Sequence, residues 1–143
     1  MNGEIALMVM SHGQFAKAAM ASLELVIGKQ NNYDTMAIEL VDNVDALKEE
    51  MFEKVAKLDT ERGLVVFTDI LGGTPMNLAG HLLVKDNVLL CSGFNLPMLL
   101  EFSLNRGKDF SEIRSVIEMA YSNGMSIATN DNLKEEEEDD LFL

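Results

Sequence analysis

The 143-residue chain has no tryptophan, and aromatic residues make up only 6% of it, so its core must be largely aliphatic. It has a single cysteine, Cys91, which excludes a disulfide framework and suits a reducing compartment. Because Cys91 lies in an apolar run, we expect an inert, buried thiol there. The two histidines and one cysteine are not spaced like a zinc site, so no metal or other cofactor is expected.

Basic residues are also scarce: 11 Lys and Arg oppose 24 Asp and Glu, which leaves a formal net charge of -13. Such a chain lacks the basic footprint that nucleic acid or an anionic membrane surface requires. Part of the negative charge lies in one acidic run, residues 135–140, and like charges in a block repel one another and stay solvated. We therefore expect one domain over residues 1–129 and a flexible acidic tail over residues 130–143, whose last three residues are apolar.

Long hydrophobic runs are missing as well. No apolar run approaches the length of a membrane span, and the first residues do not resemble a signal peptide, so we expect a cytoplasmic protein. The short apolar runs that do occur are typical of strands buried on both faces. The strands are predicted at residues 4–10, 35–41, 63–68 and 87–92, with a short final strand at residues 125–128.

Segments with apolar residues at helical spacing alternate with these strands. Asp42 or Asn43 can cap the second helix, Ser111 can cap the last one, and Thr74-Pro75 predicts an N-cap followed by the first helical residue. The helices are predicted at residues 15–27, 44–58, 75–83, 97–104 and 112–123. Alternating buried strands and helices imply a doubly wound, flavodoxin-like α/β sandwich with a mainly parallel sheet.

Ligands of such folds bind beyond the carboxyl ends of the strands. Three loops lie at that edge, at residues 11–13, 69–75 and 92–98. They bring a histidine, an aspartate, several glycines and a helix start to one edge of the sheet. This edge is therefore the candidate site.

His12, in the first of these loops, is the candidate nucleophile, because a neutral imidazole can attack phosphorus if one ring nitrogen is free. Asp69 can hydrogen-bond to the other nitrogen, which fixes the tautomer and stabilises the imidazolium. Gly13 leaves room for a substrate to approach. Each residue also has a plainer interpretation: a lone loop histidine is usually only polar surface, and an aspartate after a strand often caps a turn.

Gly72-Gly73-Thr74 directly precedes a helix, so its backbone N–H groups and the helix dipole can cradle an anion such as a phosphoryl group. The Thr74 hydroxyl can add a donor. By itself this is a common pattern. His81 lies about two turns into the same helix, so we expect a structural or surface role for it.

The three loops, in order and at matching spacing, resemble the IIA component of the mannose family of the bacterial sugar phosphotransferase system. Their motifs are Ser11-His12-Gly13, the segment 69–75 (DILGGTP) and the segment 93–98 (GFNLPM), and the resemblance covers residues 1 to about 128. It implies that the histidine-containing phosphocarrier protein phosphorylates Nε2 of His12. It also implies that a IIB component then takes the phosphoryl group, and that the sugar is phosphorylated during its transport through membrane IIC and IID subunits.

The resemblance also assigns the remaining site residues. It implies that Asp69 is the supporting carboxylate and that Gly72, Gly73 and Thr74 form the phosphoryl-binding loop. It implies a homodimer as well, in which a C-terminal strand is paired or exchanged, and residues 125–128 are the candidate.

Two alternatives stay open. One is a receiver-type domain phosphorylated on Asp69, although receivers bind Mg²⁺ with acidic residues after the first strand, where Ser11 and His12 stand. The other is a non-catalytic or regulatory flavodoxin-like module with an idle histidine, which fold alone does not distinguish.

Overall fold

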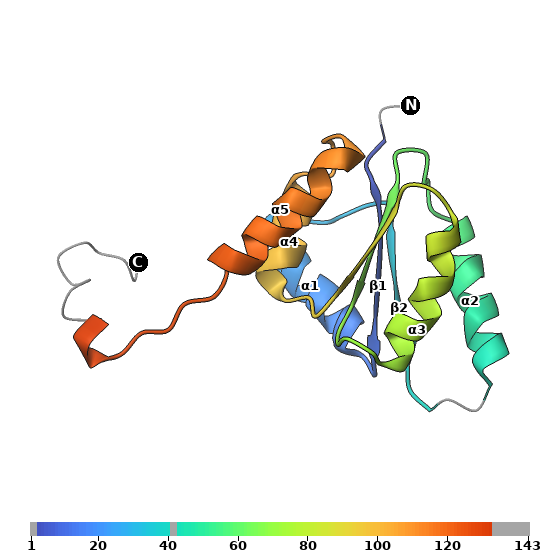
Figure 1. Ribbon diagram of the computed structural model, residues 1–143, viewed down its shortest axis with the longest axis horizontal. Helices are drawn as coiled ribbons and strands as arrows, with labels where there is room; N and C mark the ends of the chain where they lie inside the picture. The colour runs from blue at the N-terminus through green and yellow to red at the C-terminus, as the bar shows by residue number, and fades with distance from the viewer. Residues whose placement is uncertain (1–2, 41–42, 133–143) are drawn as a thin grey trace.

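A computed structural model of the chain describes residues 3–40 and 43–132 (Figure 1). Its sheet is parallel throughout, with the strand order β2-β1-β3-β4. The strands are β1 (Ala6–His12), β2 (Tyr33–Ile38), β3 (Leu64–Thr68) and β4 (Val88–Ser92). This order is that of the flavodoxin-like fold without a fifth strand, which confirms the predicted class.

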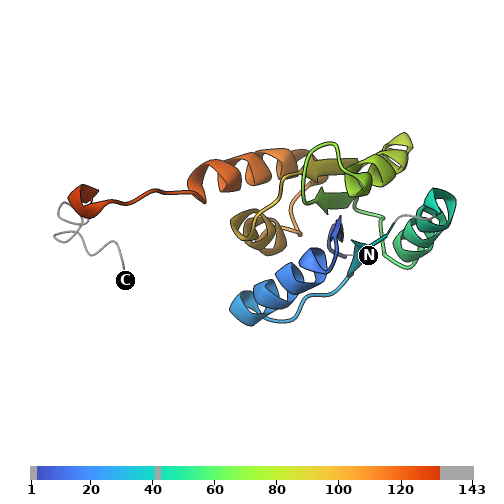
Figure 2. The ribbon, with the colours of Figure 1, turned by 90° about the horizontal axis from the view of Figure 1, so that it is seen from below.

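Helices cover both faces of the sheet (Figure 2). One layer consists of α1 (Phe15–Ile27), α4 (Leu96–Leu104) and α5 (Phe110–Asn123), and the other of α2 (Val44–Ala56), α3 (Thr74–Ala79) and the 3₁₀ helix η1 (Gly80–Val84). Side chains of β1 alternate between the layers: Leu7 and Val9 pack under α1, whereas Met8 and Met10 pack under α2 and α3. The central strand is therefore apolar on both faces.

Several helix ends differ from the predictions. The N-cap of α3 is Gly73 rather than Thr74, and the N-cap of α5 is Asp109 rather than Ser111. Asn43 caps α2 as predicted, through a hydrogen bond from the Ala46 N–H, and the other candidate cap, Asp42, lies outside the described residues. None of the helices within residues 3–40 and 43–132 is long and apolar enough to cross a membrane.

The predicted C-terminal strand is wrong for the single chain. Residues 125–128 follow the end of α5 at Gly124 without regular structure, and they are exposed and lead away from the body of the domain (Figure 1). The side chains of Met125 and Ile127 are 67% and 77% exposed. A strand needs a neighbouring strand for its hydrogen bonds, and this segment pairs with none of the four strands that the structure describes. The acidic run at residues 135–140 and the apolar residues 141–143 lie outside the described residues.

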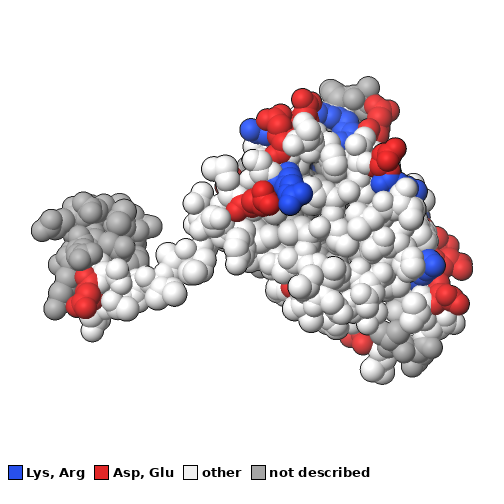
Figure 3. Space-filling view, in the orientation of Figure 1, with Lys and Arg blue, Asp and Glu red and all other residues white. Residues whose placement is uncertain are grey.

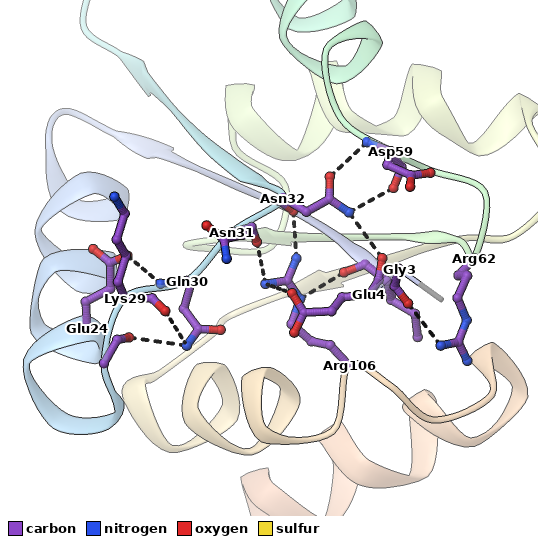
Figure 4. Close-up of polar contacts among 12 residues, drawn as sticks. Gly3, Glu4, Glu24, Lys29, Gln30, Asn31, Asn32, Asp59, Arg62 and Arg106 are labelled. Atoms are coloured by element: carbon purple, nitrogen blue, oxygen red, sulfur yellow. Dashed lines mark hydrogen bonds and ion pairs between the residues drawn. The ribbon is translucent and has the colours of Figure 1, made fainter. Parts of the chain in front are cut away.

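At the amino ends of the strands, the buried Arg106 ties three segments together (Figure 4). Its guanidinium donates to the backbone carbonyls of Ile5, Asn31 and Asn32 at 2.9, 2.7 and 2.6 Å, and it lies 3.8 Å from a carboxylate oxygen of Glu4. Burial lowers the pKa of Arg106, and Glu4 opposes that shift. This end of the sheet is closed by structural contacts, so the opposite edge remains for a site.

Candidate active site

His12 is the last residue of β1 and is paired with Ile38 of β2, so it belongs to the strand rather than to a turn after it. Its backbone N–H donates to Oδ2 of Asp69 at 2.9 Å, and its ring Nδ1 lies 2.8 Å from the same oxygen. Because an ionised carboxylate only accepts, this contact assigns the proton to Nδ1 and leaves a lone pair on Nε2. The side chain is 49% exposed, so a partner can reach that lone pair.

Asp69 follows β3 and is mostly buried, with 10% of its side chain exposed. Its Oδ1 accepts the N–H of Ile70 at 3.0 Å, so the carboxylate caps the turn and orients His12 at the same time. Burial by itself raises the pKa of Asp69, but the hydrogen bonds and charge of His12 and the bond from Ile70 outweigh burial and lower it. The carboxylate is therefore held in its ionised form.

Gly73 lies directly against the ring of His12. A Cβ at this position would stand 2.7 Å from Cε1 and 3.3 Å from Nε2 of that ring. The φ angle of Gly73 is -84°, which any residue can adopt, so glycine is required here for space and not for backbone freedom. Nε2 thus points into the loop that opens α3.

The predicted phosphoryl-binding residues lie around this point. Gly73 is the N-cap of α3 and Thr74 its first residue. Gly13 has a φ of +56°, and a Cβ there would meet nothing within 4 Å, so the approach on that side is open. Two of the backbone N–H groups are already paired: that of Gly72 donates to Sδ of Met76 at 3.0 Å, and that of Gly13 donates to the carbonyl of Ile38 at 2.8 Å. Sequence reasoning missed Met76, and no signal pointed to it, because the capping pattern has Glu or Gln at the third helical residue and the predicted N-cap was Thr74.

Residues of the other two motif loops contact the first turn of α1, the helix that follows His12. The fully buried Ser11 accepts the N–H of Ala16 at 2.7 Å, which starts α1 directly behind His12. In the loop after β4, Phe94 stacks on Phe15 of α1, with ring centroids 5.1 Å apart. These contacts join the start of α1 to the loops after β1 and β4 at the carboxyl edge of the sheet.

For the two remaining candidates the predictions hold only in part, because the segment of His81 is a 3₁₀ helix rather than part of an α-helix and Cys91 is less buried than expected. His81 is exposed in η1. Cys91 is half-buried, and burial raises the pKa of its thiol to about 11, so little thiolate exists at neutral pH. The chemistry at this edge is therefore that of an imidazole paired with a carboxylate.

The family model described as EIIA-man, PTS system fructose IIA component, matches residues 6–121. The PTS system mannose-specific EIIAB component of Escherichia coli (strain K12) is 32% identical over 106 residues, which are 73% of this chain and 33% of that protein. The chain therefore spans about a third of the length of this relative. The PTS system fructose-specific EIIA component of Bacillus subtilis (strain 168) is 29% identical over 98 residues, which are 68% of this chain and 67% of that one.

Solved structures agree with this match. The PTS IIA protein associated with the fucose utilization operon from Streptococcus pneumoniae superposes with a TM-score of 0.77 at 25% identity, covering 87% of this chain and 93% of that one. The mannose/sorbose specific IIA subunit from Enterococcus faecalis gives 0.78 at 19% identity, covering 89% and 96%. At that identity the second likeness concerns the fold alone.

Proposed function

The chain belongs to the EIIA-man family of phosphotransferase system IIA components, and from this premise we propose that it is a phosphocarrier that works through a phosphohistidine at His12. The donor is the histidine-containing phosphocarrier protein and the acceptor is a IIB component. The phosphoryl group then reaches a sugar during its transport through membrane IIC and IID subunits. The observation that carries the proposal is the 2.8 Å contact between Nδ1 of His12 and Asp69, with the ring half exposed.

The proposed transfer begins with attack of the Nε2 lone pair on the phosphorus of the donor phosphohistidine. A P–Nε2 bond forms, the donor's P–N bond breaks, and its electron pair returns to the donor ring. The proton on Nδ1 stays hydrogen-bonded to Asp69, whose ionised carboxylate stabilises the positive charge that the ring gains. In the second transfer, the IIB acceptor attacks phosphorus and the P–Nε2 electron pair returns to His12. Gly13, Gly72, Gly73 and Thr74 form the proposed binding loop for the phosphoryl group.

His12 is a better acceptor than Asp69 in this geometry. Both N–H groups of His12 bind Oδ2 of Asp69, and the N–H of Ile70 binds Oδ1, so the carboxylate is engaged on both oxygens. Its side chain is also far less exposed than the imidazole. This favours the phosphohistidine over the acyl phosphate of a receiver-type domain.

The surroundings of His12 suit a protein partner. Phe15, Leu40, Ile70 and Leu71 follow the strand ends at this edge and are all at least half exposed. Exposed apolar groups around a reactive residue are typical of a contact surface for another protein. We propose that donor and acceptor both bind here, in the cytoplasm, and that the sugar itself does not.

We further propose that the chain is a homodimer, with β4 as the shared edge. The strand order leaves β4 unpaired on one side, and a groove of about 670 Å³ lies between it and α5, with Cys91 and Tyr121 in its lining. Figure 3 shows a broad area without charged side chains at the centre of this face, over β4, with one charged pair beside it and other charges at the upper and right rim; Glu118, which pairs with Arg114, lines the groove on the α5 side. We propose that residues 125–128 of a second copy pair with this edge of β4 as an additional strand.

The dimer is tested by sedimentation equilibrium of the full chain and of the Ile127→Pro variant. A proline removes a ladder hydrogen bond, so the variant should be monomeric while the parent is dimeric. A parent that sediments as a monomer at every concentration contradicts the dimer. A dimeric Ile127→Pro variant contradicts the proposed role of residues 125–128.

Phosphoryl transfer is tested by incubating the chain with labelled phosphoenolpyruvate and the two general phosphotransferase proteins. The parent should gain label that survives alkali and is lost in mild acid, as a phosphohistidine does, and His12→Ala should gain none. Label on His12→Ala excludes His12 as the acceptor, and a label lost in alkali identifies an acyl phosphate on a carboxylate such as Asp69. If a known IIA component is labelled in the same mixture and this chain is not, the non-catalytic module is favoured.

A further inference from the structure

Met76 occupies a particular place in the loop beside His12. With Gly73 as the N-cap, Met76 is the third residue of α3, and it is half-buried. Its thioether Sδ accepts the N–H of Gly72 at 3.0 Å. The side chain therefore reaches back over the start of its own helix to the loop that contacts the imidazole.

In helices that begin with a capping box, this position carries Glu or Gln. In a capping box, the side chain of the third helical residue reaches back to a backbone N–H at the helix start. Met76 makes the same kind of contact one residue further back, to Gly72, with an uncharged and weaker acceptor. A carboxylate in that place would put a negative charge beside a phosphoryl group that itself carries a charge of about -1.5 to -2.

The contact acts on His12 through Gly73. Gly72 has a φ of +83°, and Gly73, next to it, lies against Cε1 and Nε2 of the ring. Holding the N–H of Gly72 therefore holds the backbone that defines the space around Nε2. A freed loop would let that space change shape while leaving the His12–Asp69 contact intact.

We propose that Met76 is a positioning residue for phosphoryl transfer at His12: its uncharged thioether fixes the Gly72–Gly73 loop without placing negative charge near the phosphoryl group. The inference rests on the proposed function. It assigns two separate properties to Met76, a hydrogen-bond acceptor and neutrality, and each can be changed alone.

Three substitutions in the full chain separate these properties. Met76→Leu keeps the bulk and neutrality but removes the acceptor. Met76→Gln keeps neutrality and an acceptor, and Met76→Glu keeps an acceptor and adds charge. Met119→Leu, at an exposed methionine of α5, is the matched control. Each protein is assayed for transfer from the phosphorylated histidine-containing phosphocarrier protein, for melting temperature, and by NMR for hydrogen exchange at the Gly72 amide.

Met76→Leu should lower kcat about fivefold with an unchanged KM for the phosphocarrier, because the loop contact and not the docking surface is lost. Its Gly72 amide should exchange faster while its melting temperature stays near that of the parent. Met76→Gln should restore both kcat and protection. Met76→Glu should restore protection but lower kcat about tenfold or more, with partial recovery at high salt, because added salt screens the repulsion.

The proposal is overturned if Met76→Leu transfers at the parental rate, if Gln fails to restore the rate, or if Glu and Gln behave alike. The amide exchange of Gly72 needs no phosphoryl donor. A parent that is never phosphorylated, yet shows Met76-dependent protection at Gly72, therefore defeats the proposed function and leaves the loop contact standing. If the parent is phosphorylated but its Gly72 amide is not protected, the proposed role of Met76 is wrong and the proposed function stands.

Discussion

The imidazole of His12 rests so closely on Gly73 that a single added carbon would stand 2.7 Å from its Cε1. Heavy atoms do not approach that closely without displacement, so any larger residue at this position must move either the ring or the loop. Asp69 holds the ring at Nδ1, the atom next to Cε1. Space at Gly73 and orientation by Asp69 together define where Nε2 points.

Gly73→Ala should therefore slow phosphoryl transfer about tenfold to a hundredfold, since small displacements of reacting groups cost rates of this order. Stability should change little, because the φ of -84° suits alanine. Gly80→Ala is the control: a Cβ there meets nothing within 4 Å, and it should leave the rate unchanged. Single-turnover transfer and thermal melts measure both effects, and a Gly73→Ala variant with the parental rate contradicts the steric argument.

Asp69→Asn should preserve the fold and slow transfer about tenfold to a hundredfold, the usual cost of losing a carboxylate that orients a histidine. The amide keeps the size of the side chain but loses the charge that stabilises the imidazolium. Rapid-quench kinetics with the phosphorylated phosphocarrier protein measure the loss. If the kinetics are unchanged, Asp69 has no part in phosphoryl transfer and its role is to cap the turn at Ile70.

The lowered pKa of Asp69 also predicts how stability depends on pH. A carboxyl with a lower pKa in the folded than in the unfolded state stabilises the fold above its unfolded pKa, about 3.9, and loses that contribution as the pH falls through the folded pKa. The stability advantage of the parent over Asp69→Asn should be present at about pH 5 and should shrink as the pH falls below about pH 4. Urea unfolding across this range measures it, and an advantage that persists at the acid end contradicts the assignment.

Arg106→Met should destabilise the fold by about 3 kcal/mol or more, because it removes the charged donor from the buried carbonyl of Ile5 and from the part-buried carbonyls of Asn31 and Asn32. Arg114→Met removes an exposed pair with Glu118 on the surface of α5 and should cost at most about 0.5 kcal/mol. Urea unfolding compares the two variants. Equal effects would mean that the Arg106 contacts contribute little. At temperatures where Arg106→Met is folded, its transfer rate should match the parent, since the clamp lies at the other end of the sheet.

The sequence was sufficient to predict the buried strands, the amphipathic helices and the parallel α/β class, because these follow from local periodicity. It also placed His12 and Asp69 at one edge, since the carboxyl ends of parallel strands share an edge. Their direct contact needed the sheet order, in which β1 and β3 are neighbours. Most helix ends shifted by one or two residues, since competing caps differ little in energy, but the helix predicted at residues 75–83 ends at Ala79 and continues as the 3₁₀ helix η1.

Other features were decided only by tertiary structure, because they depend on residues that the chain brings together from far apart. The space at Gly73 exists because an imidazole from β1 lies over it, and the clamp of Arg106 joins carbonyls at positions 5, 31 and 32. Residues 125–128 have the composition of a strand but pair with none of the four strands that the structure describes, so they form no strand in the single chain. Periodicity determines what a segment can become, whereas the partner that satisfies its hydrogen bonds and fills its space is set by the assembled fold.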